Sequence, residues 1–224
     1  MSLNVKAWLG LAFLAAAMAV PLFAAAGTIR YWQGWVFLAV FFGASLAGVL
    51  YSMKHDPALL RRRLAGGPTA EKTATERLIV FLVSIGFAGL VVVPGLDHRF
   101  GWSAVPISVV IGGNILIAIG FGIVFLVFRE NSFAAATIQV VEGQRVISTG
   151  PYAVIRHPQY AASFLYLLGM PLALASWWGV LVFAGMVPLI IWRLRDEEML
   201  LARDLPGYAD YQARVRWRLI PGVY

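Results

Sequence analysis

Apolar runs long enough to cross a lipid bilayer constrain this chain most. The first covers residues 7–26, about the twenty residues that a helix needs to span the hydrocarbon core. Hydrophobic residues make up 60% of the sequence, and its mean hydropathy is +0.77. Ordinary soluble domains are much less apolar. Lipid is therefore the expected solvent for much of this protein.

The sequence predicts an all-α, polytopic membrane protein with about five to six transmembrane helices. The last two apolar segments are short and are joined at Ser176-Trp177, so we interpret them as a C-terminal helical hairpin whose second helix continues to about Arg203. A short turn at residues 97–99 is expected after the third segment. The six predicted segments are residues 7–26, 35–53, 74–95, 103–128, 160–175 and 177–192.

Basic residues in the loops predict the orientation. With six crossings, both termini and every long polar loop fall on one side, and only Arg30 and Arg99 of the eighteen Lys and Arg residues lie outside. The positive-inside rule then places both termini and the long loops in the cytoplasm, as in a bacterial-type inner membrane. The loop at 54–77 supplies Lys54, Arg61, Arg62, Arg63, Lys72 and Arg77. Two alternatives stay open, a substrate head group bound by this loop and a signal peptide cleaved after Ala24-Ala25-Ala26.

Composition excludes several classes of function. The net charge of +7 is explained by orientation and anionic lipid head groups, because no basic stripe interleaved with aromatic residues suggests nucleic acid. The chain has no cysteine and three scattered histidines, so we expect no disulfide, iron–sulfur cluster or metal centre. No Gly-x-Gly-x-x-Gly or phosphate loop occurs.

Local signals predict details of the helices. Thr73-Ala-Thr-Glu76 has the spacing of a capping box, which predicts a helix start near Ala74. Four glycines of the fourth apolar segment are expected to permit close contact with a neighbouring helix, as small residues do in membranes. They are Gly112, Gly113, Gly120 and Gly122.

Two polar clusters interrupt the apolar C-terminal half. The first, Gly150–Tyr160, ends the longest polar stretch, and its Pro158 suits the first turn of the following helix. His157 would then lie at the helix N-terminus, where free amides favour an anion. In the second cluster, Arg193 and Glu197 are four residues apart and share one helix face, whereas Glu198 points about a third of a turn away. An intrahelical ion pair at the lipid interface is the alternative to a ligand site.

Together with Tyr208-x-x-Tyr211, Val215 and Pro221, these clusters resemble the isoprenylcysteine carboxyl methyltransferase and phospholipid methyltransferase group of integral membrane enzymes. The resemblance covers residues 132–221. It implies that residues 1–128 carry the first four transmembrane helices and that residues 129–224 form a catalytic region of polar loop, hairpin and amphipathic tail. It also implies S-adenosyl-L-methionine as the cofactor.

The resemblance implies the site residues as well. Arg193 would face the methyl acceptor and orient its anionic group bidentately, and Arg193, Glu197 and His157 would be the catalytic residues. Glu197 would hold the ammonium group of the cofactor, and His157 with the helix N-terminus would hold its carboxylate. The implied cofactor contacts are Gln139, Gln144, Arg145, Val146, Ile147, Tyr152, His157, Pro158, Gln159, Tyr160 and Glu197.

The methyl acceptor is expected to be a lipophilic molecule that enters laterally from the bilayer. Isoprenylcysteine carboxyl O-methylation is the preferred interpretation. N-methylation of phosphatidylethanolamine-type lipids and S-methylation of small thiols are the alternatives. Membrane lipids are expected partners, and nucleic acid and metal are not. The rival outside enzymes is a small transporter or membrane scaffold, which predicts charges within several spans, whereas the first four spans have almost none.

Overall fold

The computed structural model describes residues 1–71 and 73–224, so Lys72 of the predicted basic loop lies outside the described residues. Within these ranges the chain is all-α, as predicted, and contains no strand. Two short 3₁₀ helices, η1 (Pro68–Ala70) and η2 (Gly150–Ala153), accompany the α-helices. These are α1 (Leu3–Ala26), α2 (Trp32–His55), α3 (Pro57–Leu64), α4 (Ala74–Phe100), α5 (Ile107–Glu130), α6 (Pro158–Ala173), α7 (Trp177–Asp204) and α8 (Tyr208–Arg214).

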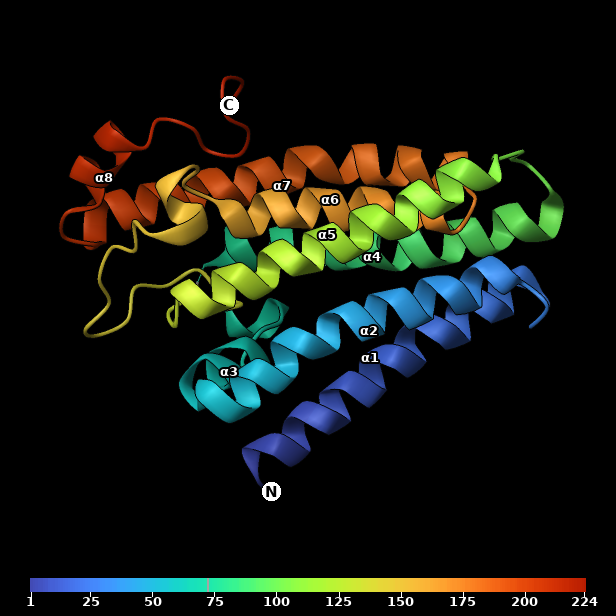
Figure 1. Cartoon of the computed structure of the whole chain (residues 1–224), viewed down its shortest axis with the longest axis horizontal. Helices are drawn as coiled ribbons and strands as arrows, with labels where there is room; N and C mark the ends of the chain where they lie inside the picture. The colour runs from blue at the N-terminus through green and yellow to red at the C-terminus, as the bar shows by residue number, and fades with distance from the viewer. Residues whose placement is uncertain (72) are drawn as a thin grey trace.

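Five helices, α1, α2, α4, α5 and α7, are long and apolar enough to cross a membrane. The sixth, α6, has 16 residues and forms the predicted hairpin with α7. Figure 1 shows the long helices running beside one another, while α3, α8 and the segment between α5 and α6 gather at one end. Large apolar side chains such as Phe13, Phe81 and Ile111 are exposed on the helices, which suits an integral membrane protein with lipid as its solvent.

The bundle has one main core in which α1, α2, α4, α5, α6 and α7 all take part. Leu22, Phe37, Leu90, Ile117 and Met170 are fully or almost fully buried there. The start of α4 is fixed by the predicted capping box, which is confirmed. Thr73 Oγ1 accepts from the Glu76 amide at 3.1 Å, and Glu76 Oε2 accepts from the Thr73 amide at 3.2 Å.

The predicted turn at residues 97–99 is wrong, because α4 continues to Phe100. Pro94 lies inside the helix, where a membrane bundle tolerates proline since neighbouring groups compensate for its missing amide. The true end is at Gly101, which adopts φ 65° and donates its amide to the Asp97 carbonyl at 2.8 Å. Glycine at this position is the usual helix terminator because it has no Cβ to strain the left-handed conformation.

Close packing of α5 on α6 positions the start of α6. A Cβ on Gly113 would overlap the backbone of α6 and lie 2.8 Å from the Gly169 carbonyl oxygen, and one on Gly120 would lie 2.9 Å from the Ala162 carbonyl oxygen. The prediction of close contact therefore holds for these two glycines. It is wrong for Gly112 and Gly122, which have open space where a Cβ would be.

The far end of the hairpin is held by a buried carboxylate. Asp97 accepts hydrogen bonds from Ser176 at 2.5 Å and from Ser103 at 2.6 Å. Tyr31 of the α1–α2 connection also donates its hydroxyl to the Leu174 carbonyl. With its turn fixed in this way, the hairpin presents the start of α6 and the end of α7 side by side at the opposite end of the bundle.

Candidate active site

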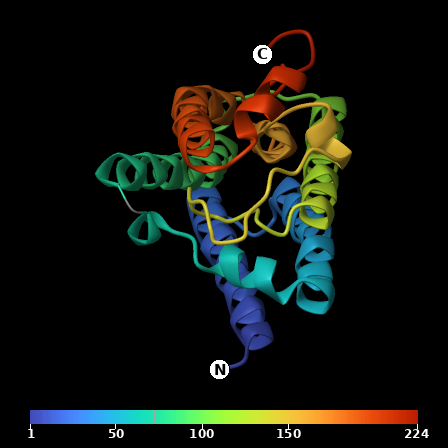
Figure 2. The same ribbon diagram turned by 90° about the vertical axis from the view of Figure 1, so that its left-hand side faces the viewer.

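A cavity of about 260 Å³ lies where α6 begins and α7 leaves the bundle. Figure 2 looks onto this end and shows the segment after α5 crossing it between α3 and α8. Every site residue predicted from the sequence lines this cavity, and the roles assigned to them remain predictions. The residues are Gln139, Gln144, Arg145, Val146, Ile147, Tyr152, His157, Pro158, Gln159, Tyr160, Arg193 and Glu197.

The C-terminal tail fixes the entry into α6. Pro158 is the first helical residue, as predicted, and His157 is the N-cap. The amides of Arg156 and His157 donate to the Trp217 and Arg218 carbonyls, each at 2.9 Å. The tail therefore folds back onto the site.

The start of α6 leaves polar groups open toward the cavity. Its first backbone hydrogen bond runs from the Ala161 amide to the His157 carbonyl at 3.1 Å. The amides of Gln159 and Tyr160 come earlier and have no place in the helical pattern. The buried His157 ring also lines the cavity, and its Nε2 lies 3.5 Å from Glu198 Oε1.

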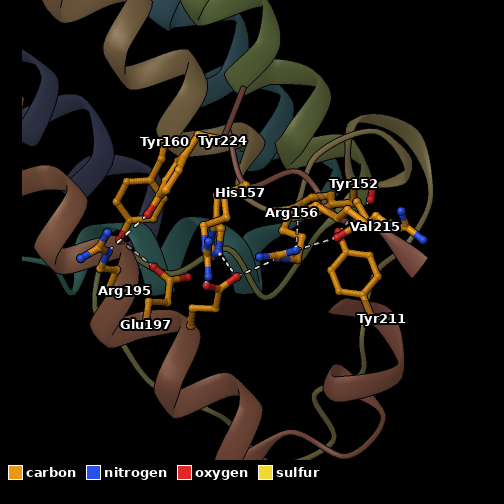
Figure 3. A network of polar contacts seen from close by, with 12 residues as sticks. Tyr152, Arg156, His157, Tyr160, Arg195, Glu197, Tyr211, Val215 and Tyr224 are labelled. Carbon is orange, nitrogen blue, oxygen red and sulfur yellow. Dashed lines mark hydrogen bonds and ion pairs between the residues drawn. The ribbon is translucent and has the colours of Figure 1, made fainter. Parts of the chain in front are cut away.

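Glu197 lies on the cavity wall with one oxygen already engaged. The Tyr160 hydroxyl donates to its Oε2 at 2.7 Å, as Figure 3 shows. No donor from residues 1–71 or 73–224 reaches its Oε1. Glu197 can therefore accept from a ligand without giving up its contact to Tyr160.

Glu198 has a structural role that the sequence analysis missed. It points away from the cavity, as its position on the helix indicated, and accepts from Arg156 Nε at 2.7 Å and Arg218 Nε at 2.6 Å. The Arg156 side of this network is drawn in Figure 3. Glu198 thus ties α7 to the entry of α6 and to the tail. The basic residues at 214–218 were the only sequence signal for such a partner.

Arg193 is paired with a residue from a distant part of the chain. Its Nη2 donates to Glu71 Oε1 at 2.6 Å and to the Ala136 carbonyl at 3.1 Å. An ion pair between Arg193 and Glu197 does not occur in the described structure. Glu71 precedes α4 and was missed, because no sequence pattern links positions 122 apart. Arg193 Nη1 is buried without a hydrogen-bond partner.

Three tyrosines line the side of the cavity next to the tail. The Tyr211 hydroxyl donates to the Tyr152 carbonyl at 2.7 Å, and Asn131 donates to the Tyr152 hydroxyl at 2.9 Å. Burial raises the pKa of Tyr211 to about 12 and the pKa of Tyr152 and of Tyr208 still further. All three hydroxyls are therefore protonated at neutral pH and can donate hydrogen bonds. That of Tyr208 is buried with no partner in the described residues.

Comparison with known proteins finds one similar family and one similar protein. Residues 108–205 match the phospholipid methyltransferase family. This part of the chain is therefore similar to the phospholipid methyltransferases. A curated relative, the nickel-cobalt-cadmium resistance protein NccN of Alcaligenes xylosoxydans xylosoxydans, is 29% identical over 136 residues, which cover 52% of this chain. The match spans 62% of the length of that relative.

The residues that match this family run from the start of α5 to the end of α7 and supply most of the cavity lining. Other parts of the chain complete the site. Tyr208 and Tyr211 come from the tail, and Glu71 comes from the segment before α4. Residues that complete the site thus lie both before and after the matched part of the chain.

Proposed function

We propose that this protein transfers the methyl group of S-adenosylmethionine to a lipophilic acceptor at the membrane surface. One observation carries the proposal beyond the family match. Two residues that line the same cavity each bury a side-chain atom without a hydrogen-bond partner in the described chain, Arg193 Nη1 and Tyr208 Oη. A buried polar atom left unpaired costs about 1–3 kcal/mol. A bound ligand that supplies the partners explains why the two occur in one cavity.

The residues present fit the charged ends of the proposed cofactor. Its ammonium group requires an acceptor such as the open Oε1 of Glu197. Its carboxylate suits the N-terminus of α6, where the Gln159 and Tyr160 amides and His157 are available. The cavity of about 260 Å³ is close to the lower end of ligand sites, roughly 300–1,000 Å³. Gln139, Tyr152 and residues 144–147 line the remainder.

The cofactor supplies an electrophilic methyl group, so the protein has to align the acceptor and exclude water. Glu197 and Arg193 are one turn apart on α7, which suits two ligands that meet between them. A carboxylate acceptor is already ionised at neutral pH and needs no general base. We therefore favour carboxyl O-methylation of the isoprenylcysteine type. N-methylation of phosphatidylethanolamine-type lipids and S-methylation of small thiols are the alternatives, and product analysis with labelled donor distinguishes them.

We further propose that the cavity opens at the cytoplasmic face of the membrane. The excess of Lys and Arg in the loops supports this orientation through the positive-inside rule. Arg99 lies at the opposite end of the bundle, where its side chain approaches Gly27. The metal resistance in the name of the relative is said of that protein alone and does not enter the proposal.

Binding of S-adenosylhomocysteine to the purified protein in lipid nanodiscs, measured by calorimetry, tests the proposal. We expect Glu197→Ala to lose this binding, because it removes the acceptor for the ammonium group. Arg193→Ala should keep the binding and retain only a small, measurable rate of methyl transfer. Glu142→Ala, which removes an exposed carboxylate outside the cavity lining, is the matched control. Equal affinity in Glu197→Ala and the parent would exclude the role of Glu197.

A further inference from the structure

The hydrogen bonds of Arg193 determine how it can hold an acceptor. A guanidinium group grips two oxygens at once with either of two pairs of nitrogens, Nη1 with Nη2 or Nε with Nη2. Both pairs include Nη2. In Arg193 this nitrogen donates to Glu71 Oε1 at 2.6 Å and to the Ala136 carbonyl at 3.1 Å. The two-point grip expected from the sequence is therefore not available while Glu71 stays in place.

Glu71 is built into the structure rather than resting on its surface. Only 2% of the residue is exposed. Its Oε2 accepts from the Ile138 amide at 3.2 Å, and its backbone carbonyl accepts from Arg77 Nε at 2.9 Å. One carboxylate thus joins α7 to the segment 136–138, which lines the cavity. Arg63 of α3 holds the residue just before this segment by donating to the Ala135 carbonyl at 3.1 Å.

We propose that Glu71 is a positioning residue that limits Arg193 to a single point of contact with the acceptor. Glu71 holds Nη2, and the buried, unpartnered Nη1 is left to bind one anionic oxygen. This inference rests on the proposed function and narrows its acceptor to an anion that presents one oxygen to the protein and another to the methyl group. A lipophilic carboxylate has this chemistry.

The single contact has a chemical advantage for methyl transfer. A two-point grip would engage both oxygens of a carboxylate and lower the nucleophilicity of each. With one oxygen on Nη1, the other remains free to form the new carbon–oxygen bond as the bond between sulfur and methyl breaks. The sulfonium becomes a neutral thioether, and the carboxylate becomes a neutral ester. No proton has to be moved.

The test is a double-mutant cycle of Glu71→Ala and Arg193→Ala in nanodiscs, with an S-farnesylated N-acetylcysteine as the acceptor. We expect Glu71→Ala to lower kcat/KM for the acceptor about tenfold to a hundredfold, because small misplacements of a binding group have effects of this size. The affinity for S-adenosylhomocysteine should stay within about twofold of the parent, as in the control Glu142→Ala. In the Arg193→Ala background, Glu71→Ala should cause no further loss, because the two residues act as one unit.

A purely structural role gives a different pattern, in which Glu71→Ala lowers activity by the same factor in both backgrounds or abolishes cofactor binding. Either result overturns the inference. If Glu71→Ala does not fold, Glu71→Gln replaces it, since its amide oxygen can still accept from Arg193 while the charge is lost. We then expect a smaller fall in kcat/KM with the same dependence on Arg193.

Different measurements test the inference about Glu71 and the proposed function. A parent protein that binds no S-adenosylhomocysteine refutes the proposed function. Hydrogen exchange at the Ile138 amide reports on Glu71 without any ligand. We expect faster exchange in Glu71→Ala and parental exchange in Glu142→Ala. Unchanged exchange in Glu71→Ala would show that Glu71 does not hold the segment 136–138.

Discussion

Removing the carboxylate of Glu198 should destabilise the protein far more than removing its exposed partner Arg218. Glu198 accepts from Arg156 at 2.7 Å, and the two side chains are only 7% and 6% exposed. Loss of one member of a buried ion pair costs about 3–5 kcal/mol, because the other charge remains buried. Arg156 keeps two other acceptors, the Val215 carbonyl at 2.7 Å and the Arg216 carbonyl at 2.8 Å. We therefore expect Glu198→Ala to cost about 3 kcal/mol, the lower end of that range.

The second ion pair of Glu198 should contribute much less. Arg218 lies 2.6 Å from Glu198, but its side chain is 37% exposed. Pairs at such positions are worth about 0–1 kcal/mol, because solvent screens them. Arg218→Ala is thus the matched control, since it breaks one ion pair of the same carboxylate without leaving a buried charge alone.

The free energy of unfolding can be measured by titration with a denaturing detergent in mixed micelles, with helix content as the readout. A loss of about 3 kcal/mol is a large part of the roughly 5–15 kcal/mol that stabilises a typical protein. A cost below about 1 kcal/mol for Glu198→Ala, or equal costs for the two variants, would refute the reasoning from burial.

Two further predictions concern packing and orientation. Gly113→Ala should destabilise the protein by about 1–3 kcal/mol, because the new Cβ would meet the backbone of α6. Gly112→Ala should be neutral or slightly stabilising, because its Cβ would meet nothing. Equal unfolding free energies for these two variants would contradict the α5–α6 contact. The chain has no native cysteine, so single cysteines at Glu142 and at Trp102 can be labelled in sealed inside-out vesicles with an impermeant maleimide. We expect labelling at Glu142 and protection at Trp102, and the opposite pattern would reverse the proposed orientation.

Local rules explain what the sequence predicted correctly. Pro158 at the first turn of α6, the Thr73–Glu76 capping box and the shared face of Arg193 and Glu197 each depend on residues a few positions apart. Their geometry is fixed by the helix itself. The family resemblance added Gln139 and the segment 144–147, which are far from α7 in the sequence. The structure brings all of them to one cavity.

Contacts between distant segments explain what could not be predicted. Helical spacing shows which face Arg193 occupies but not that Glu71 lies opposite it. The same limit applies to Glu198, whose partners Arg156 and Arg218 come from two other segments. The end of α4 was misplaced for another reason. Pro94 was interpreted as a helix end, although the terminating glycine was Gly101, seven positions later.

The carboxylates near the cavity differ in whether the protein itself engages both of their oxygens. Glu198 is used by Arg156 and Arg218, and Glu71 is used by Arg193 and the Ile138 amide. Within the described chain, Glu197 keeps an oxygen without a donor, and Arg193 keeps a nitrogen without an acceptor.

These two open groups are four residues apart on α7, a rise of about 6 Å along the helix axis. Each engaged partner also fixes the direction of the group that stays open. Tyr160 holds one oxygen of Glu197, and Glu71 holds one nitrogen of Arg193. The open pair therefore presents one negative and one positive contact in fixed positions. The ammonium group of the proposed methyl donor and the anionic group of an acceptor, held side by side, would satisfy both at once.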